Sequence, residues 1–322
     1  MSESSRRLQS SGARVRVTHA GLCGSDLHRL TAGSLFGTLG HEITGVVTEV
    51  DPQSPCPTSV EVGDRVAVMP LLACGKCAAC KVGSTNLCRD GEAIGRTQPG
   101  GFGGEVTVPI TNVYRLPRGV DSEVGALADV IAVCVHAVNL AGEVAGKRCL
   151  VIGDGAVGVA MALLLRQNQA RVTLTGKHPE NHALIKKLSG GYVLTASPDD
   201  LRGEYAHVFE TVGRDQPDTL NMAVRLVRFQ GQVTVLGVYP GDFWQPLAAR
   251  ELFIKEGTLV GSNSYVQREF FAALGILASA PEVFRGLVTH RFPLDHFEAG
   301  VEALRYKAGP TVKVMFEVGG GQ

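Results

Sequence analysis

The chain has 322 residues, enough for two domains of ordinary size. Apolar residues make up 44% of the sequence and charged residues 19%, which is the composition of a globular protein with a core. Lysine plus arginine equals aspartate plus glutamate, 31 of each, so the net charge of zero gives no electrostatic reason to expect nucleic acid or an anionic membrane as a partner. The longest apolar run, near residues 130–141, contains polar residues and is too short to span a bilayer.

The first dozen residues, MSESSRRLQSSG, are biased toward serine and arginine. They lack the apolar segment of a signal peptide, and we expect a disordered tail rather than a targeting sequence. The expected location is therefore the cytoplasm, a reducing compartment in which clustered thiols bind metal more often than they form disulfides.

The predicted elements fall into three groups along the chain. Short β-like runs separated by Gly/Pro turns fill the first third, at residues 13–20, 42–50, 65–69 and 105–108. A helical pattern over 122–141 is followed by alternating strands and helices, at 148–175, 179–188, 192–194, 207–210, 218–227 and 232–238. The tail contains a predicted helix over 266–277 and an extended segment over 311–317. The alternating middle predicts an α/β domain with a parallel sheet covered by helices on both faces.

A glycine motif opens the alternating region. Gly153, Gly155 and Gly158 form G-x-G-x-x-G, around Ala156 and Val157, between an apolar strand and an apolar helix. In this context the motif predicts a dinucleotide pyrophosphate at the helix N-terminus. The alternative is a glycine-rich turn without a ligand.

The second strand of this unit bears on cofactor preference. An acidic residue usually ends that strand in NAD-binding units and binds the ribose 2′-hydroxyl. Here Gly176 stands at that position, and Lys177 and His178 follow. Cations without a carboxylate suit a 2′-phosphate, so the sequence predicts NADP(H) over NAD(H). The alternative is a basic solvated loop.

Four cysteines lie within fifteen residues, with the spacing C-x2-C-x2-C-x7-C. Four thiolates are the usual ligands of structural zinc and leave no position free for a substrate. An iron–sulfur cluster has similar ligand needs, and disulfides are the remaining alternative. We therefore expect a structural metal site at Cys74, Cys77, Cys80 and Cys88.

A second candidate site combines Cys23, in GLCGSDLH, with His41 and Glu42, in LGHE. One cysteine and one histidine with a third protein ligand, and a fourth position left to water or substrate, is the layout of a catalytic zinc. Taken alone, a single cysteine and a single histidine are more often buried core residues.

The surrounding motifs are more specific. GLCGSDLH, GHE, VGDRV, the four-cysteine lobe, GGFGGE, VIGDGAVG and ETVG occur in the order in which they occur in the zinc-dependent medium-chain dehydrogenase/reductase superfamily, and the chain resembles that superfamily over residues 13–318. The resemblance implies a mainly β, GroES-like catalytic domain at 1–130 and 263–322. It also implies a Rossmann domain with a doubly wound parallel sheet at 131–262.

The resemblance also implies roles for individual residues. Cys23 and His41 look like the first two ligands of the catalytic zinc, and Glu42 like an exchangeable ligand. Asp129, in GALADV, matches the third ligand of the polyol and threonine dehydrogenase branch, and Cys134 is its rival if the helix register shifts. Ser25 and His28 match a hydroxyl and an imidazole that relay the alcohol proton through the cofactor ribose to solvent.

Further positions match cofactor contacts of the superfamily. Val212 lies in a turn that lines the adenosine pocket in relatives, Gly237 and Val238 in one that lines the nicotinamide pocket, and Ser262 near the carboxamide. Lys313 matches a basic position used for a cofactor phosphate. The alternatives are ordinary turns and a surface lysine.

The expected function is that of a zinc-dependent oxidoreductase with two zinc ions per chain. It would transfer a hydride between NADP(H) and a secondary alcohol, polyol or sugar-like substrate and its ketone. The competing interpretation, which the short N-terminal segment favours, is a non-catalytic or redox-sensing relative that binds NADPH and structural zinc. A homodimer or homotetramer is expected by analogy. The sequence does not specify the substrate, the direction of reaction or whether the first methionine is the native start.

Overall fold

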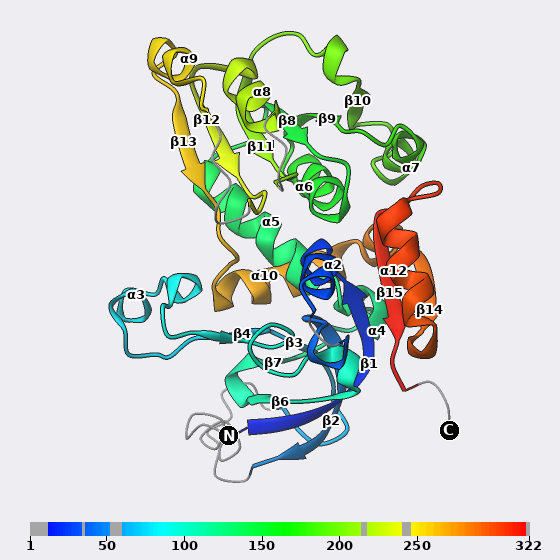
Figure 1. Cartoon of the computed structure of the whole chain (residues 1–322). Helices are drawn as coiled ribbons and strands as arrows, with labels where there is room; N and C mark the ends of the chain where they lie inside the picture. The colour runs from blue at the N-terminus through cyan, green and yellow to red at the C-terminus, as the bar shows by residue number, and fades with distance from the viewer. Residues whose placement is uncertain (1–11, 34–35, 52–59, 214–217, 240–245, 320–322) are drawn as a thin grey trace. The chain divides into compact units, whose positions relative to one another are not determined.

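The computed structural model describes residues 12–33, 36–51, 60–213, 218–239 and 246–319 of the chain (Figure 1). The tail expected over the first dozen residues lies outside these ranges except for Gly12. The chain divides into two compact units, 1–132 with 265–322, and 133–264. These divisions are two residues from the predicted domain boundaries. No helix in the described ranges is long and apolar enough to cross a membrane.

The first unit is built on a seven-stranded sheet in the order β14-β15-β1-β2-β3-β7, with β6 also paired to β1. Strand β1 (Gly12–Leu22) lies at the centre, antiparallel to β2 (Glu42–Val50) on one side and to β6 and β15 on the other. The remaining strands are β3 (Arg65–Val68), β6 (Glu105–Pro109), β7 (Val113–Arg115), β14 (Val288–Pro293) and β15 (Lys313–Glu317). A separate pair, β4 (Leu71–Leu72) and β5 (Glu92–Ala93), supports the four-cysteine segment.

Three phenylalanines join the N-terminal and C-terminal parts of this unit in one core. The ring centroids of Phe102, Phe297 and Phe316 lie 5.2–5.4 Å apart, two of the three pairs edge-to-face. A Cβ at position 300 would lie 2.3 Å from the Phe316 ring, so Gly300 lets helix α12 (Phe297–Tyr306) approach the sheet. The segment that returns after residue 264 is therefore part of the core of the first unit.

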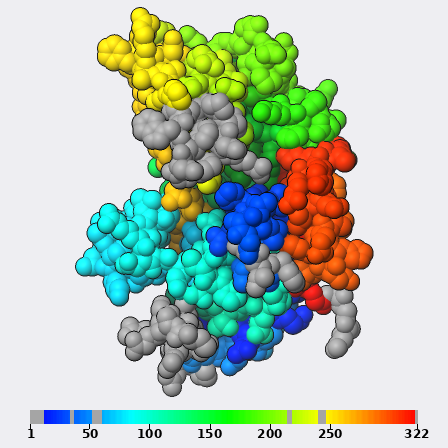
Figure 2. All heavy atoms as spheres, viewed as in Figure 1, coloured from blue at the N-terminus to red at the C-terminus, as the bar shows by residue number. Residues whose placement is uncertain are grey.

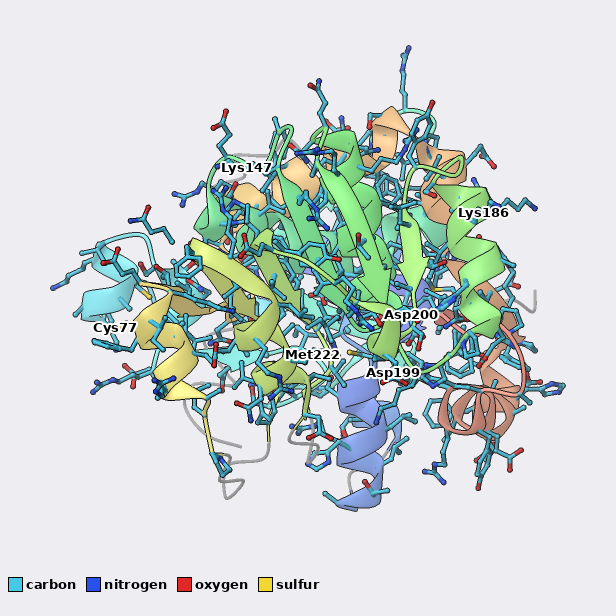
Figure 3. The ribbon with its side chains drawn as sticks, turned by 90° about the horizontal axis from the view of Figure 1, so that it is seen from above. Cys77, Lys147, Lys186, Asp199, Asp200 and Met222 are labelled. Atoms are coloured by element: carbon cyan, nitrogen blue, oxygen red, sulfur yellow. The ribbon has the colours of Figure 1, made fainter. Side chains whose placement is uncertain are left out.

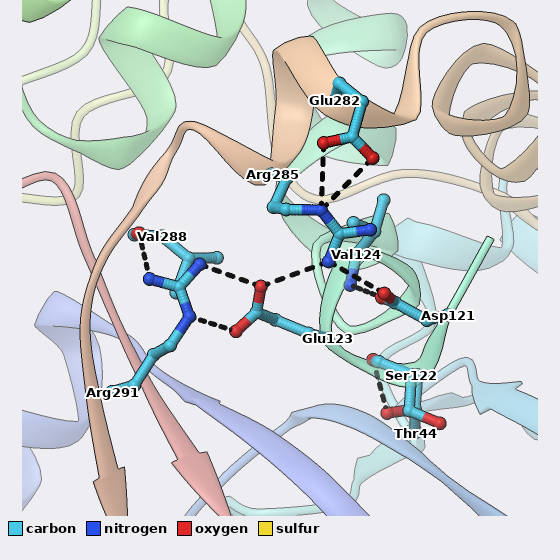
Figure 4. A network of polar contacts seen from close by, with 9 residues as sticks. All are labelled: Thr44, Asp121, Ser122, Glu123, Val124, Glu282, Arg285, Val288 and Arg291. Carbon is cyan, nitrogen blue, oxygen red and sulfur yellow. Dashed lines mark hydrogen bonds and ion pairs between the residues drawn. The ribbon is translucent and has the colours of Figure 1, made fainter.

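A polar network joins helix α4 (Ser122–Gly125) to the returning segment (Figure 4). Glu123 accepts hydrogen bonds from the guanidinium of Arg291, and Arg285 pairs with both Asp121 and Glu123. Asp121 also accepts a hydrogen bond from Val124 N at 3.0 Å, which caps α4. The predicted helix over 122–141 is thus two helices, α4 and α5 (Ala128–Ala141), separated by a two-residue break.

The second unit is a six-stranded, wholly parallel sheet in the order β10-β9-β8-β11-β12-β13. Its central strands, β8 (Arg148–Ile152) and β11 (Tyr205–Glu210), are continuous buried runs, as expected where helices cover both faces. The other elements are α6 (Ala156–Gln167), β9 (Arg171–Thr175), α7 (Glu180–Leu188), β10 (Leu194–Ala196), α8 (Asp218–Leu226), β12 (Val227–Val235), α9 (Ala249–Ile254) and β13 (Thr258–Gly261). The predicted fold class, a GroES-like β domain with a Rossmann domain, is confirmed.

Two predicted strands are shifted. The strand predicted at 232–238 begins at Val227 and ends at Val235, because Gln230, with φ +54°, and Gly231 form a register shift within the pairing instead of ending it. The strand predicted at 192–194 begins at Leu194, because Gly190 and Gly191 both have positive φ and delay the start of extended backbone.

Candidate active site

Cys23, His41 and Glu42 lie close together at one end of the central strands of the first unit. Cys23 follows β1 and precedes α2 (Gly24–Thr31), and His41 and Glu42 stand at the start of β2. One ligand atom from each of the three lies within 4.8 Å of the other two. Antiparallel pairing of β1 with β2 produces this arrangement, since Gly21 is paired with Glu42.

Asp26 lies against two of these residues. Its Oδ2 accepts a hydrogen bond from Cys23 N at 3.0 Å, and its Oδ1 lies 3.4 Å from His41 Nδ1. Asp26 is fully buried and His41 is 3% exposed. A carboxylate behind a histidine fixes its ring orientation and leaves the other nitrogen free to bind a metal.

The charge state of this group suits a cation. Burial opposes ionisation of Cys23 and Asp26, but the neighbouring His41 outweighs burial and lowers the pKa of both. Burial also opposes protonation of His41, yet Asp26 and Cys23 raise its pKa well above the ordinary value. A cysteine with a lowered pKa is held toward the thiolate, which is the form that binds metal.

Glu42 lies in a space that a glycine provides. A Cβ at position 21 would lie 2.0 Å from Glu42 Oε2, so Gly21 is required for this side chain to cross β1. Glu42 Oε1 accepts a hydrogen bond from Lys313 Nζ at 2.6 Å, whereas Oε2 is buried and has no hydrogen-bond partner among the described residues. Burial raises the pKa of Glu42 despite the charge of Lys313. An unpartnered carboxylate oxygen beside a thiol and an imidazole fits a metal ligand.

Lys313 stands at the start of β15, beside Glu42. Lys313 is 2% exposed, and its ammonium is paired with Glu42 of strand β2 in the same sheet. In this structure its charge is paired with that of Glu42, and its contact with a cofactor phosphate stays a prediction.

Asp129 lies in the first turn of α5 and is half-buried. The Tyr265 hydroxyl donates a hydrogen bond to Asp129 Oδ1. Asp129 is not part of the three-residue group, but its charge acts on the pKa of Glu42 and of Lys313. Cys134 lies five residues further along the same helix, where its thiol donates to Val157 O. Five residues turn a helix by about 500°, so the two side chains do not face one metal.

Ser25 and His28 lie one turn apart on α2. Ser25 Oγ is buried and lacks a hydrogen-bond partner within the described ranges, whereas His28 is exposed. The two predicted relay residues therefore connect a buried position to solvent along one face of a helix.

The four cysteines form a second group in a lobe of the first unit. All four sulfurs lie within 4.8 Å of one another, with Cys77 Sγ 3.5 Å from Cys80 Sγ and 3.8 Å from Cys88 Sγ. A tetrahedron with metal–sulfur bonds of about 2.3 Å has edges of about 3.8 Å, whereas a disulfide bond is about 2.05 Å long. Backbone N–H groups of Cys74 and Cys77 also point at sulfurs of the group. The arrangement fits four metal ligands and not a disulfide.

The lobe that carries these cysteines consists of helix α3 (Ala78–Lys81) and short turns around it. Figure 2 shows it in cyan, projecting from the teal part of the same unit, and Figure 3 labels Cys77 within it. Hydrogen bonding from Cys80 N lowers the pKa of Cys77 to about 6. Burial and the hydrogen bonds with Cys77 and Cys88 raise the pKa of Cys80 to about 12, so ionisation of Cys77 is favoured at the expense of its neighbour. The thiolate is the form that binds metal.

The glycine loop lies between β8 and α6, as predicted. Gly153 has φ +119°, a conformation that favours glycine, and a Cβ at Gly158 would lie 1.9 Å from Gly153 O. Gly155 faces open space, and the first turn of α6 begins immediately after it at Ala156 and Val157. A helix N-terminus next to open space suits a pyrophosphate.

The predicted turns of the second unit also meet. A Cβ at Gly213 would lie 2.3 Å from Val238 N, so the turn containing Val212 lies against the turn of Gly237 and Val238. Buried Glu210 supports this junction by accepting hydrogen bonds from Val212 N and Gly213 N. Ser262 donates its N–H to Val235 O, and its hydroxyl is buried and unpartnered among the described residues.

Four residues that the sequence analysis did not select take part in these sites. They are Asp26, Tyr265, Asp154 and Glu210. Asp26 stands within the GLCGSDLH motif and Asp154 within the glycine motif, so their position in a recognised motif was the available signal. Tyr265 had none, because its contact with Asp129 joins residues 136 positions apart.

Comparisons with known proteins agree with this arrangement. Residues 9–118 match the model of the alcohol dehydrogenase GroES-like domain, and residues 124–318 match that of the glucose dehydrogenase C-terminus. The chain is 29% identical to L-galactonate-5-dehydrogenase of Escherichia coli K12, with 87% of this chain and 84% of the relative covered. It is also 29% identical to L-threonine 3-dehydrogenase of Mesorhizobium japonicum, over 94% of this chain and 90% of the relative.

Among solved structures, a zinc-binding dehydrogenase of Sinorhizobium meliloti 1021 bound to NADP is 27% identical, with a TM-score of 0.83. That comparison covers 96% of this chain and 92% of the other.

Proposed function

Because this chain belongs to the zinc-dependent medium-chain dehydrogenase/reductase superfamily and is an oxidoreductase, we propose that it transfers a hydride between NADP(H) and a secondary alcohol, polyol or sugar-like substrate. The observation that carries the proposal is the convergence of Cys23, His41 and Glu42 within 4.8 Å. The named relatives act on L-galactonate and L-threonine. Carbon 5 of galactonate and carbon 3 of threonine each carry a secondary hydroxyl, which supports this substrate class.

Cys23 and His41 would hold the catalytic zinc, with Glu42 and Asp129 as the carboxylates available for a further position. When bound, zinc supplies a Lewis acid that lowers the pKa of a hydroxyl group at the site. Asp26 keeps His41 oriented, and Lys313 holds one oxygen of Glu42 while the other remains available. The four cysteines of the lobe would hold a second, structural zinc.

Ser25 would take up the substrate proton in the oxidative direction and return it in the reductive direction. The Ser25 hydroxyl is buried and has no hydrogen-bond partner among the described residues, which supports this role. His28, one turn away and exposed, would exchange that proton with solvent.

The proposed preference for NADP(H) is based on the residues at the end of β9. Gly176 offers no carboxylate of its own there, and the neighbouring Lys177 is exposed. The Sinorhizobium relative was solved bound to NADP, which supports NADP(H) as a cofactor. The cytoplasmic location and the homodimer or homotetramer expected from the sequence stay predictions.

A panel of secondary alcohols, polyols and their ketones, assayed with NADP(H) and NAD(H), tests the proposal. We expect turnover of at least one pair, with higher kcat/KM for NADP(H). Cys23→Ser should abolish turnover and retain NADPH binding, while the buried Cys149→Ala variant serves as the matched control. NADPH binding without turnover of any pair would favour the non-catalytic relative instead.

A further inference from the structure

The end of strand β9 has a carboxylate after all, supplied from a neighbouring loop. Asp154, the second residue of the glycine motif, extends its side chain toward Gly176. A Cβ at position 176 would lie 2.1 Å from Asp154 Cγ, so only glycine leaves room for this carboxylate. Gly176 therefore has a structural role: it makes room for the side chain of Asp154. Its presence is more than the absence of an acidic side chain at this position.

Both oxygens of Asp154 are occupied by the loop that follows β9. Oδ2 accepts a hydrogen bond from His178 N at 2.6 Å, and Oδ1 lies 2.7 Å from His178 Nδ1. The backbone oxygen of Asp154 accepts a third hydrogen bond from Asn181 Nδ2 at 3.0 Å. Asp154 is 3% exposed. Because the carboxylate is buried and both of its oxygens already contact His178, it is poorly placed to accept a hydrogen bond from a ribose hydroxyl.

The same contacts fix the imidazole of His178. An ionised carboxylate only accepts hydrogen bonds, so Nδ1 must carry the hydrogen that it shares with Asp154. Nε2 then lies on the opposite edge of the ring, and the side chain of His178 is 31% exposed. Lys177, the adjacent residue, is exposed as well. With the hydrogen on Nδ1, Nε2 donates to an anion only in the imidazolium form of the ring, which the adjacent carboxylate and an approaching phosphate both stabilise. In that form His178 and Lys177 are two adjacent donors at the end of β9.

We propose that Asp154 is a specificity-determining positioning residue: it holds His178 so that the outer edge of the imidazole, together with Lys177, binds the 2′-phosphate of NADP(H). This inference rests on the proposed preference for NADP(H) and assigns it to a residue of the glycine loop. Phosphate is bound by donors held in a fixed geometry, and the carboxylate supplies that geometry for a ring that would otherwise rotate.

The test is the dissociation constant of NADPH and of NADH, measured by fluorescence titration of the zinc-loaded protein without substrate. Asn at position 154 has one acceptor oxygen for two donors, so one contact with His178 is lost. Asp154→Asn should raise the dissociation constant of NADPH about tenfold and change that of NADH less than about twofold, as expected for losing a hydrogen bond to a charged group. Glu180→Gln, a charge neutralisation at the start of α7, is the matched control and should change neither constant.

His178→Ala should reproduce the loss of NADPH affinity, and the double variant should lose little more, because both changes remove one interaction. An equal loss of NADH and NADPH affinity, a loss confined to NADH, or an unchanged NADPH affinity would each overturn the proposal. If Asp154→Asn does not fold, His178→Ala alone decides, since an unchanged ratio of the two constants contradicts the proposal.

The wild-type measurement separates this inference from the proposed function. A wild-type protein that binds NADH more tightly contradicts the cofactor preference, whatever the variants do. A wild-type protein that prefers NADPH, with a ratio that Asp154→Asn leaves unchanged, contradicts only the role of Asp154.

Discussion

The ammonium of Lys313 lies 2.6 Å from Glu42 Oε1, and both side chains are almost completely buried. Removing one member of a buried ion pair leaves the other charge without compensation. Lys313→Met should therefore lower the free energy of unfolding by roughly 3–5 kcal/mol in chemical denaturation. Lys147→Met, which removes a half-exposed partner 3.9 Å from Glu143, is the control and should cost less than about 1 kcal/mol.

The double variant Lys313→Met with Glu42→Gln should recover much of the lost stability, because it also removes the uncompensated charge. If Lys313→Met alone is as stable as the wild-type protein, the buried pair does not exist in solution.

Asp26 touches both Cys23 and His41, so we expect its loss to weaken one metal site selectively. Asp26→Asn should reduce zinc affinity at that site roughly 10–100-fold, the usual effect of losing a residue that orients a metal-binding histidine. Competition with a chromogenic chelator measures this change. The zinc held by the four cysteines should be retained, and the exposed Asp90→Asn variant should resemble the wild-type protein. Loss of both zinc ions together would show that Asp26 stabilises the whole unit instead.

The hydroxyl of the buried Tyr265 donates to the half-buried Asp129. If Asp129 is a zinc ligand, Tyr265→Phe should lower zinc affinity about tenfold by freeing the carboxylate to rotate. Tyr114→Phe is the matched control, because Tyr114 packs against the same Phe270 ring at 5.2 Å. Unchanged zinc affinity in both Tyr265→Phe and Asp129→Ala would exclude Asp129 as a ligand.

The ionisation of Asp121 predicts how the stability of the protein depends on pH. Burial opposes its ionisation, but the hydrogen bond from Val124 N and the charge of Arg285 lower its pKa below the ordinary value. A lowered folded-state pKa contributes stability that is complete above the unfolded pKa and is lost as pH falls through the folded value. Asp121→Asn keeps an equally good N-cap and loses the charge paired with Arg285, so it should cost less than about 1 kcal/mol at pH 7. The difference from wild type should shrink as pH falls below about 3.9, the ordinary pKa of aspartate, and vanish below the lowered folded-state pKa. A difference that is constant with pH would contradict this account.

The sequence predicted what local patterns encode. The glycine motif, the four-cysteine spacing and the alternation of strands and helices depend on neighbouring residues, and each is found where it was expected. The contacts that orient the active site depend on pairing between distant segments. Lys313 meets Glu42 across 271 positions because β15 and β2 flank β1, and no local pattern around the lysine indicates this contact.

The contact between Asp154 and Gly176 is a second example of pairing between separate segments, here within one domain. The absence of an acidic residue on β9 was visible in the sequence, but its replacement by Asp154 from the adjoining β8 loop was not. Parallel pairing of β8 with β9 brings these two strand ends together, and no pattern within either segment records it.

Zinc stoichiometry tests the central claim most directly. The account predicts two zinc ions per chain in the wild-type protein and one in His41→Ala, which should lose turnover, bind NADPH and keep the zinc of the four cysteines. Two zinc ions in His41→Ala with full activity, or one in the wild-type protein, would contradict a catalytic zinc at Cys23 and His41.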